Sequence, residues 1–512
     1  MTMVGPAGET HTDSSARPRA YVLTAGDPAN DPRIGWVART LAARFEVCEL
    51  GLHRDLSSAR PPQISKIEQH RTRAHLPATP LPAYIADTNQ TTFGENEGWN
   101  ALAGFAYETS SSDKAHSPRA TRERHAHLRR ILRTNVSLIR AARALGPAEL
   151  IVAADIETLA AGAALKQEFG ARLIYDAHEF WPYSFPQFSS AEEEQAWIRI
   201  ERKLLKATDA RFVVSPGLAE AMEKEYGTSF LSLPNAVPLA EAASAPNRGN
   251  RSSGRLEFLF LGGFAPERGL KLLIGAWSKT PANCVLLLQG PDNPYKLEMI
   301  AAAKQTGLLG SRILFPPPVP ETNLIERAAQ ADVGLVPYEP TLINHIHCSP
   351  NKLSQYMAAG LPILANNTRF VEQIVQQADC GLIVDFNNSA ALASAVSELA
   401  RDESERRKFG LNARRGFEAF FNWDVHSPAL DAAAGFPKRS KQQSASDPVA
   451  ALKAEFQKHA RDRPASSGTL GRLGRSALRL SLKAAWHGIP FLRVIVLSNP
   501  RYRQRAEEFR EL

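Results

Sequence analysis

The feature that most constrains the fold is an alternation of short apolar, β-branched segments with helical patterns between residues 20 and 425. Such alternation is typical of parallel βαβ units, in which a helix connects two strands of one sheet. We therefore expect an α/β protein with two parallel-sheet halves. The expected strands cover 20–24, 46–50, 150–153, 172–176 and 211–214 in the first half, and 256–261, 284–289, 312–315, 333–337, 362–365 and 381–384 in the second.

Breaks in composition divide the chain further. The segment 240–255 is rich in Ala, Ser, Asn, Gly and Arg, which is typical of an interdomain linker. Residues 54–120 show few periodic segments, and we expect them to form a long loop region on the first domain. The expected units are a disordered N-terminus at 1–19, a first domain at 20–239, the linker, a second domain at 256–428 and a flexible basic tail at 429–512.

The net charge of +8 is a property of the tail. From residue 438 onward the chain holds 16 Lys and Arg against 6 Asp and Glu, whereas the rest holds 45 against 47. Because the body is nearly neutral, we expect no nucleic-acid partner. In the tail, a basic amphipathic helix is expected at 470–486, which suits either an anionic membrane surface or docking on the protein itself. Its cationic face consists of Arg472, Arg475, Arg479 and Lys483.

Cysteine spacing and hydropathy indicate the compartment. The four cysteines are far apart and form no CxxC pair, so neither a disulfide framework nor a zinc site is indicated. The first nineteen residues lack the apolar core of a secretory signal. No apolar run reaches the roughly 18 residues that span a bilayer. We expect a cytoplasmic protein, with peripheral attachment to the inner face of the plasma membrane as a further hypothesis.

A glycine-rich segment at 261–269 follows an expected strand and precedes a helical run. Gly262 and Gly263 allow a tight turn and a close approach to a ligand, and Gly269 opens a helix whose free N–H groups favour an anion. Arg268 is placed where a guanidinium could hold a phosphate with two parallel hydrogen bonds. Glycines at such a turn also occur without any ligand, so a plain βα connection is the alternative.

A second segment, 349–362, predicts a loop that leads into a short helix. Ser349 or Asn351 can cap this helix, and Gln355 lies one turn further on the same face as Asn351. The apolar residues of the helix are expected in the core, while its polar residues are free to face a cleft.

A third candidate group follows the strand expected at 172–176. His178 and Glu179 lie just beyond this strand, where the active groups of parallel α/β domains gather. A histidine at such a position either faces a ligand or only supports the structure, and the sequence leaves both interpretations open.

Taken together, these segments resemble a family 4 glycosyltransferase of the GT-B fold over about residues 20–425. The resemblance implies two Rossmann-like domains that face each other across a cleft, with the acceptor on the first and the donor on the second. It also implies transfer from a nucleotide diphosphate sugar, with retention at the anomeric carbon and no required metal or cofactor. The markers are 31–34, 175–179, 201–202, 207–209, 214–215, 233–238, 262–269 and 350–362.

The resemblance also implies roles for individual residues. Arg268 would meet the diphosphate, the backbone of 349–352 the transferred sugar, and Gln355 the ribose hydroxyls. The acceptor would be a glycan or a lipid-linked molecule in the synthesis of a cell-surface polysaccharide or glycolipid. The predicted catalytic residues are His178 and Arg268; the predicted donor-binding residues are Gly262, Gly263, Arg268, Gly290, His347, Ser349, Asn351, Lys352 and Gln355; the predicted acceptor-side residues are Gly26, Asp31 and Glu179.

Three positions depart from the family pattern. Gly263 stands where a second basic residue is usual, so one phosphate partner is missing or comes from elsewhere. His347 and Gln355 replace two glutamates eight positions apart, and a neutral Gln loses charge-assisted hydrogen bonds. These departures leave a catalytically silent homologue that acts as a binding partner as one alternative. A nucleotide-sugar epimerase is another, which the 350–362 segment disfavours.

Overall fold

The computed structural model describes residues 17–28, 31–52, 83–86, 131, 134–184, 191–242 and 254–435. Predictions for residues 1–16, for most of the 54–120 region and the linker, and for the tail beyond 435 with its helix at 470–486 lie outside these residues. Among the helices of the described part, none has the length and apolar character that a bilayer-spanning segment requires.

The first domain is built on a parallel sheet of seven strands in the order β3-β2-β1-β4-β5-β6-β7. The order reverses between β1 and β4, a change that opens a crevice at the carboxyl ends of the strands. The short strand β3 pairs with β2 and lies inside the region that was expected to be a loop. The sequence did not predict this strand because four residues are too few to show a period. The strands are β1 (Arg19–Leu23), β2 (Glu46–Leu52), β3 (Ala83–Ala86), β4 (Leu150–Ala154), β5 (Arg172–Ala177), β6 (Ala210–Val213) and β7 (Leu231–Ser232).

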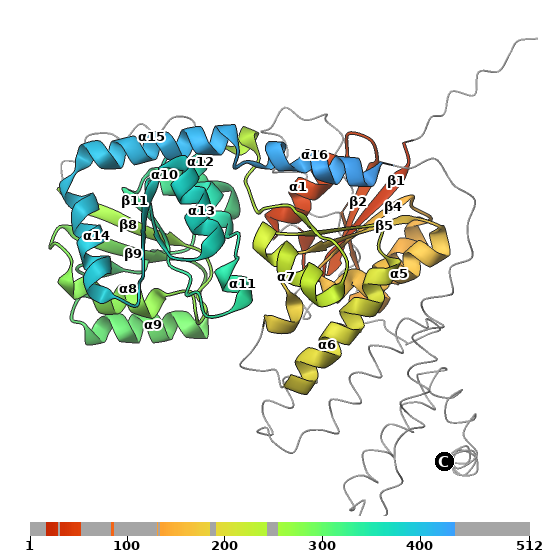
Figure 1. The fold of residues 1–512 in the computed structure, drawn as a ribbon, viewed down its shortest axis with the longest axis horizontal. Coiled ribbons are helices and arrows are strands. Elements are labelled where there is room, and N and C mark those ends of the chain that lie inside the picture. Colours follow the sequence, from red (N-terminus) through yellow and green to blue (C-terminus); the bar gives the residue numbers. More distant parts are fainter. Residues whose placement is uncertain are drawn as a thin grey trace, which may run out of the picture.

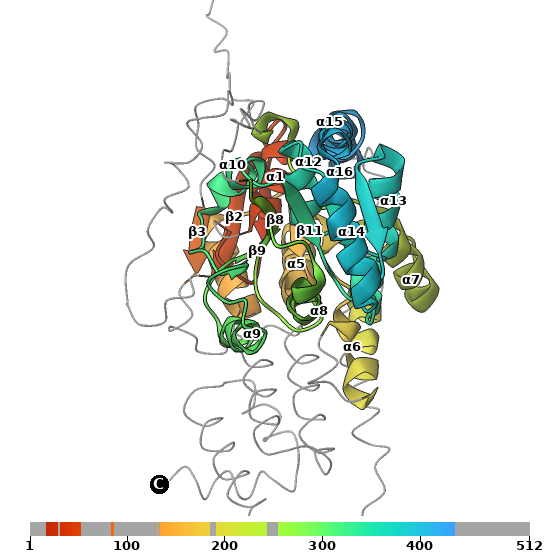
Figure 2. The same ribbon diagram turned by 90° about the vertical axis from the view of Figure 1, so that its left-hand side faces the viewer.

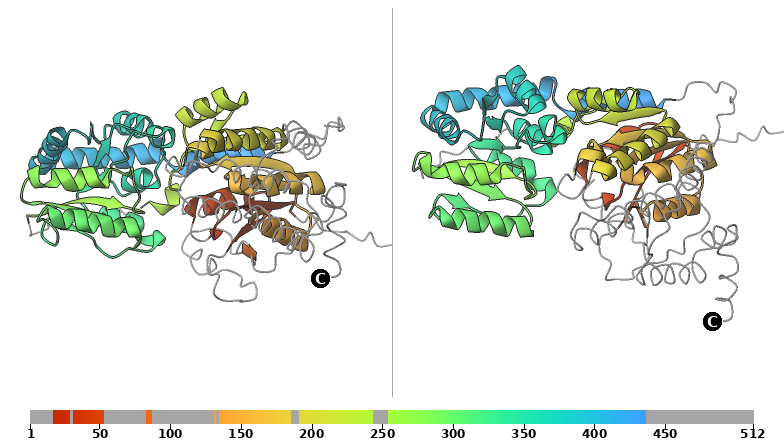
Figure 3. Two further views of the ribbon diagram at one scale, coloured as in Figure 1. Left: turned by 90° about the horizontal axis from the view of Figure 1, so that it is seen from below. Right: turned by 60° about the horizontal axis from the view of Figure 1, so that its bottom comes forward.

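The second domain repeats this arrangement with six parallel strands in the order β10-β9-β8-β11-β12-β13. The two domains lie side by side (Figure 3). The expectation of an α/β fold with two Rossmann-like parallel-sheet domains is therefore confirmed. The strands are β8 (Leu256–Leu261), β9 (Cys284–Gln289), β10 (Ile313–Leu314), β11 (Val333–Val336), β12 (Ile363–Asn366) and β13 (Gly381–Val384).

Helices cover both faces of the sheets, which explains the continuous apolar strands. On β8, Phe258 and Phe260 point into the core beside α8, α9 and α14, whereas Leu259 and Leu261 point into the core beside α12, α13 and α15. The helices are α1 (Pro32–Leu41), α5 (Ile156–Phe169), α6 (Ala191–Leu204), α7 (Pro216–Tyr226), α8 (Leu270–Ala276), α9 (Pro294–Gln305), α10 (Leu324–Ala329), α11 (Ile343–Ile346), α12 (Asn351–Ala358), α13 (Arg369–Ala378), α14 (Ser389–Arg401), α15 (Glu403–Ala419) and α16 (Trp423–Ala434).

The last described helix returns the chain to the first domain. α15 runs along the second domain, and α16 packs against α1 of the first (Figures 1 and 2). The ring of Trp423 lies 5.6 Å from that of Trp36, and its indole N–H donates to Thr40 Oγ1 at 2.9 Å. The domain boundary expected after residue 428 therefore falls inside α16, and residues 429–434 belong to this helix.

Candidate active site

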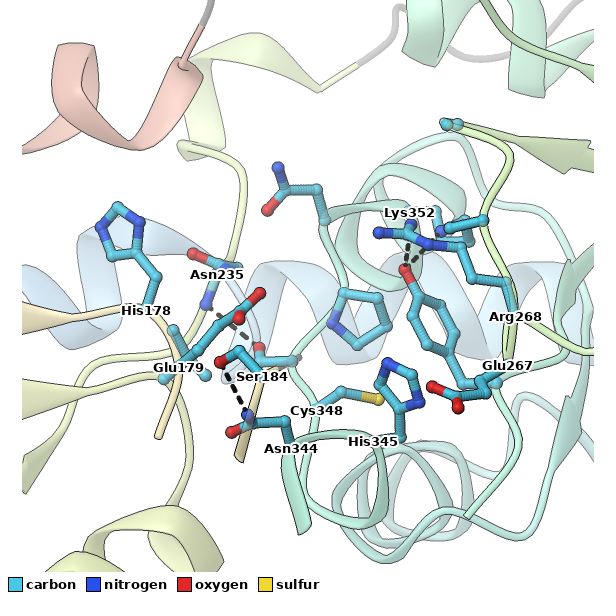
Figure 4. A pocket seen from close by; sticks show the side chains of 18 of the residues that line it. His178, Glu179, Ser184, Asn235, Glu267, Arg268, Asn344, His345, Cys348 and Lys352 are labelled. Carbon is cyan, nitrogen blue, oxygen red and sulfur yellow. Dashed lines mark hydrogen bonds between the residues drawn. The ribbon is translucent and has the colours of Figure 1, made fainter. Parts of the chain in front are cut away.

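A pocket of about 500 Å³ lies between the two domains, beyond the carboxyl ends of β5, β8 and β11 (Figure 4). Its volume is in the range of small-molecule sites. Four of the predicted site residues do not line it: Gly26, Asp31, Gly290 and His347. The predicted residues that line it are His178, Glu179, Gly262, Gly263, Arg268, Ser349, Asn351, Lys352 and Gln355.

The loop after β8 forms one wall, and its backbone requires glycine at two points. Gly262 has a φ of 136° and Gly269 a φ of 68°, a region that side-chain-bearing residues rarely adopt. A Cβ on Gly269 would also overlap the carbonyl oxygen of Pro337. Gly290 supports this loop from outside the pocket, since a Cβ there would overlap the carbonyl oxygen of Gly262. Gly290 thus shapes the loop without facing the pocket itself.

Two cations meet at one tyrosine hydroxyl in this wall. Arg268 Nη1 donates to Tyr338 Oη at 2.8 Å, and Lys352 Nζ donates to the same oxygen at 3.0 Å (Figure 4). The Lys352 ammonium also lies 4.6 Å from the centre of the Tyr338 ring. It stands 3.5 Å from the place that a Cβ on Gly262 would occupy. Lys352 therefore places a second cation beside this loop, in which position 263 is a glycine and not a basic residue.

The pKa values in this wall follow from the two cations. Burial raises the pKa of Tyr338, but Arg268 and Lys352 outweigh it and bring this pKa below its usual value. Burial lowers the pKa of Lys352, while the Tyr338 oxygen opposes this change. Within the described part of the chain, neither Arg268 nor Lys352 forms an ion pair with a carboxylate. Their charge is left for an anionic ligand.

The start of α12 forms the floor of the pocket, but its capping differs from the expectation. Neither Ser349 nor Asn351 caps the helix, because Pro350 occupies the N-cap position and no side chain bonds to the first N–H groups. Ser349 Oγ instead accepts the N–H of Asn235, in the first domain, at 3.1 Å. Asn351 Oδ1 is buried and has no hydrogen-bond partner among the described residues. Gln355, 6% exposed, completes this floor.

His178 lies in the opposite wall, held by two carboxylates. Its Nδ1 is 3.2 Å from Asp155 Oδ2, its Nε2 is 3.5 Å from Asp176 Oδ2, and its backbone N–H donates to Asp155 Oδ1 at 2.8 Å. Burial lowers the pKa of His178, but Asp155 and Asp176 outweigh it and raise this pKa to about 9. The imidazole is therefore protonated at neutral pH, on the wall of the pocket.

Arg33 gives the first marker segment, residues 31–34, a structural role. Its Nε and Nη2 donate to the two oxygens of Asp176 at 2.9 and 2.6 Å, and its Nη1 donates to Leu233 O and Asn235 Oδ1 at 2.9 and 3.0 Å. Burial raises the pKa of Asp176, but Arg33 and His178 outweigh it and hold this pKa well below its usual range. One buried guanidinium thus fastens the end of β5 to the segment that leads out of the first domain.

Besides Gly290, three of the predicted residues lie outside the pocket for identifiable reasons. His347 packs on the first turn of α7, where a Cβ on Gly217 would overlap the imidazole. Asp31 accepts the N–H of Arg33 at 3.0 Å and so caps α1. The carbonyl of Gly26 accepts a backbone hydrogen bond from the end of β2. In this structure His347 contacts the other domain, Asp31 caps a helix, and Gly26 bonds to the end of a strand.

Several pocket residues were not predicted from the sequence. Tyr338 follows β11, so the strand-end rule that selected His178 could have found it. His345 has a buried Nδ1 without a described partner, and burial together with Arg268 lowers its pKa to about 4, so it is neutral. No local pattern marks Asn344, because its contacts are with the other domain. The unpredicted polar residues are Tyr183, Ser184, Asn235, Glu267, Glu321, Tyr338, Asn344, His345 and Cys348.

Comparisons with protein families and curated proteins show which proteins this chain resembles. A model described as "Glycosyl transferases group 1" matches residues 243–416, and one described as "Glycosyltransferase Family 4" matches residues 102–241. The phosphatidyl-myo-inositol mannosyltransferases of Mycobacterium leprae and Mycolicibacterium smegmatis are 25% and 22% identical over 42% and 43% of this chain. The matched regions cover 56% and 55% of those relatives, so the chain spans about half their length.

Solved structures share the two-domain arrangement. Sucrose-phosphate synthase from Thermosynechococcus elongatus superimposes with a TM-score of 0.59 at 19% identity, covering 81% of this chain and 98% of that one. WaaG, a glycosyltransferase involved in lipopolysaccharide biosynthesis, superimposes with a TM-score of 0.52 at 16% identity and the same coverage. Likeness at this level of identity shows a common fold.

Proposed function

Because the chain belongs to the family 4 (group 1) glycosyltransferases, we propose that it transfers a sugar from a nucleotide diphosphate sugar to an acceptor. The observation that carries this proposal is the pair of cations, Arg268 and Lys352, that meet at Tyr338 in the interdomain pocket. Guanidinium and ammonium groups bind phosphate oxygens through charge-assisted hydrogen bonds. The second-domain wall is therefore the donor side of the proposed site.

The proposed chemistry depends on the leaving group. Transfer breaks the bond between the anomeric carbon and a diphosphate oxygen, and the diphosphate leaves with the electron pair. The same carbon bonds to an acceptor hydroxyl oxygen, which gives up its proton. Donors that are already in place lower this barrier, because they need no reorganisation as the charge develops. Arg268 and Lys352 are held by Tyr338, and the first N–H groups of α12 carry no side-chain cap. Retention at the anomeric carbon, without a required metal or cofactor, belongs to the same proposal.

We propose that His178 is the catalytic residue on the first-domain wall. Its imidazolium is 17% exposed and faces the pocket that the two cations line from the other side. Because Asp155 and Asp176 keep it protonated, it adds positive charge where the diphosphate separates from the sugar. Arg268 and His178 thus act from opposite walls in this scheme.

The acceptor is proposed to enter along the first-domain wall. Of the residues predicted for this side, Glu179 lines the pocket and is placed to accept hydrogen bonds from sugar hydroxyls. A glycan or lipid-linked acceptor, in cell-surface polysaccharide or glycolipid synthesis, suits both the relatives named for phosphatidyl-myo-inositol and the basic tail. The cytoplasmic face of the plasma membrane would bring such an acceptor and a soluble donor together.

A catalytically silent homologue is the second candidate, and Gln355 is the observation that favours it. This neutral amide stands in the donor-side floor where the family pattern has an acidic residue. Lys352 favours an active enzyme, because it supplies a cation beside the loop in which position 263 is not basic.

The deciding experiment is a screen of UDP- and GDP-sugars with the full chain. Release of UDP or GDP, with and without candidate acceptors, would identify the donor and separate an enzyme from a silent homologue. Nucleotide binding without release from any donor in the panel would favour the silent homologue. Absence of binding as well would contradict the proposed function.

The membrane proposal has its own test. Residues 438–512 carry the excess of positive charge, and each cation near an anionic surface contributes about 1 kcal/mol. Deleting them should abolish salt-sensitive binding to anionic vesicles, while donor hydrolysis by the remaining body persists. Equal vesicle binding with and without the tail would contradict the proposal, and loss of folding on deletion would favour a docked helix.

A further inference from the structure

One segment of the second domain contacts the first domain at three points. We call residues 342–349 the interdomain strap; it contains α11 and leads directly into α12. Asn344, His347 and Ser349 each reach a different element of the first domain. The strap therefore joins the donor-side floor of the pocket to the wall that carries His178.

Asn344 makes the most specific of these contacts (Figure 4). Its Oδ1 accepts the N–H of Phe180 at 2.8 Å, while its Nδ2 donates to Phe180 O and to Ser184 Oγ, both at 3.1 Å. One amide thus satisfies both backbone groups of Phe180, two residues after His178. Asn344 is 7% exposed, so water does not replace these bonds unless the domains move apart.

The other two contacts anchor the strap on either side of Asn344. The His347 ring occupies the space over Gly217 that any side chain there would fill. Ser349 Oγ accepts the N–H of Asn235, whose side chain in turn accepts from Arg33. The strap is therefore tied to the same buried network that holds Asp176 beneath the His178 ring.

We propose that Asn344 is a positioning residue for sugar transfer, holding the 178–180 backbone of the first domain at a fixed distance from the donor site of the second. This inference rests on the proposed function. Asn344 acts through Phe180 on one side and through the continuous strap to Lys352 on the other. A displacement of about 1 Å between reacting groups can cost about a hundredfold in rate, so a single amide at this junction affects turnover.

The first test separates donor binding from turnover in the full chain. Asn344→Ala removes all three bonds and Asn344→Asp removes the two that Nδ2 donates, so both should lower kcat about ten- to hundredfold. The donor KM and the Kd for the nucleotide diphosphate should change by less than about twofold, because Arg268 and Lys352 are intact.

Asn412→Ala is the matched control. Asn412 Nδ2 donates to the carbonyl oxygen of Asp379 at 2.9 Å, a bond of the same type that lies wholly within the second domain. Its loss should leave kcat and KM unchanged.

The second test does not depend on activity. Hydrogen exchange at the Phe180 amide of the full chain should be faster in Asn344→Ala than in the wild type or in Asn412→Ala, because only the first loses the interdomain acceptor. Unchanged exchange and unchanged kcat would overturn the inference and leave the proposed function intact. A fall in donor affinity equal to the fall in turnover would also overturn it, since Asn344 would then bind the donor. If the wild type turned over no donor, the proposed function would fail, and Phe180 exchange would still decide whether Asn344 holds this backbone.

Discussion

The two walls of the pocket use their cations differently. On the first-domain wall the cations are paired with carboxylates: Arg33 binds both oxygens of Asp176, and His178 lies between Asp155 and Asp176. On the second-domain wall, Arg268 and Lys352 converge on the Tyr338 hydroxyl, and neither has a carboxylate partner in the described part of the chain.

This difference indicates a division of labour between geometry and binding. A buried cation paired with a carboxylate holds two segments together, because separating the pair leaves an uncompensated charge in the protein interior. A cation held by a hydroxyl keeps its position without being neutralised, so it remains available to an anion. The Arg33–Asp176 pair of the first-domain wall is therefore expected to govern stability, and the cations of the second-domain wall nucleotide affinity.

The largest expected effect comes from breaking the first-domain pair. Arg33→Met removes both guanidinium hydrogen bonds from the buried Asp176 carboxylate and leaves it only the His178 ring, whose Nε2 is 3.5 Å away. Arg33 and Asp176 are only 2% and 1% exposed, so water does not replace the lost partner. We expect the free energy of unfolding, measured with urea, to fall by about 3–5 kcal/mol.

Two further variants sharpen this result. Arg33→Met combined with Asp176→Leu should recover part of the lost stability, because it also removes the buried carboxylate that lost its guanidinium partner. Arg143→Met, at the exposed pair of Arg143 with Glu168, should cost less than about 1 kcal/mol. Equal losses in Arg33→Met and Arg143→Met would contradict the structural role assigned to the buried pair.

A buried acid in the first domain gives the next effect, and it depends on pH. Glu201 is fully buried and accepts hydrogen bonds from Tyr175 and Tyr226 at 2.7 and 2.5 Å, yet burial raises its pKa to about 7. The folded state therefore holds this proton more tightly than the unfolded state, so stability decreases as pH rises from about 4.5 to 7. Glu201→Gln should remove this decrease, gaining up to about 3 kcal/mol relative to the wild type by pH 8. Thermal unfolding curves from pH 4.5 to 8 would test it, and a constant difference between the two proteins would contradict it.

The donor-side cations are expected to affect binding without this loss of stability. Arg268→Ala and Lys352→Met should each weaken binding of the nucleotide diphosphate by about 1.5–3 kcal/mol, because each removes a charged hydrogen-bonding partner. Calorimetric titration of the nucleotide product would measure this. If Arg268→Ala alone weakened binding, Lys352 would not be the second cation of the loop. Unchanged affinity in both folded variants would mean that the donor side has been assigned wrongly.

These predictions also show how far the sequence alone could lead. The strand expected at 284–289 is found as β9, with the same bounds, because strands buried on both faces are unbroken apolar runs. The absence of a cation at position 263 was visible in the sequence, but the approach of Lys352, 89 positions later, to this loop depends on the fold. His347 was expected in the pocket because it stands where the family pattern has one of two glutamates, whereas its place against Gly217 depends on how the domains pack. The residues of a segment determine its secondary structure, whereas contacts between domains depend on how the domains pack.

The last prediction concerns His178, which lies on the paired wall but faces the pocket. His178→Ala should lower turnover roughly tenfold, equivalent to about 1.4 kcal/mol, because a fixed positive charge near the departing diphosphate is lost. The melting temperature should change little, since the alanine variant keeps the backbone N–H that donates to Asp155, and Asp176 keeps Arg33. With a pKa of about 9, His178 is protonated at neutral pH, so wild-type turnover should fall as pH rises through 9. Asp155→Asn removes the charge that is the largest single cause raising this pKa, and should move the fall in turnover to lower pH. A melting temperature several degrees lower in His178→Ala, with normal turnover and an unchanged pH profile, would place this histidine with Arg33 among the groups that only hold the structure.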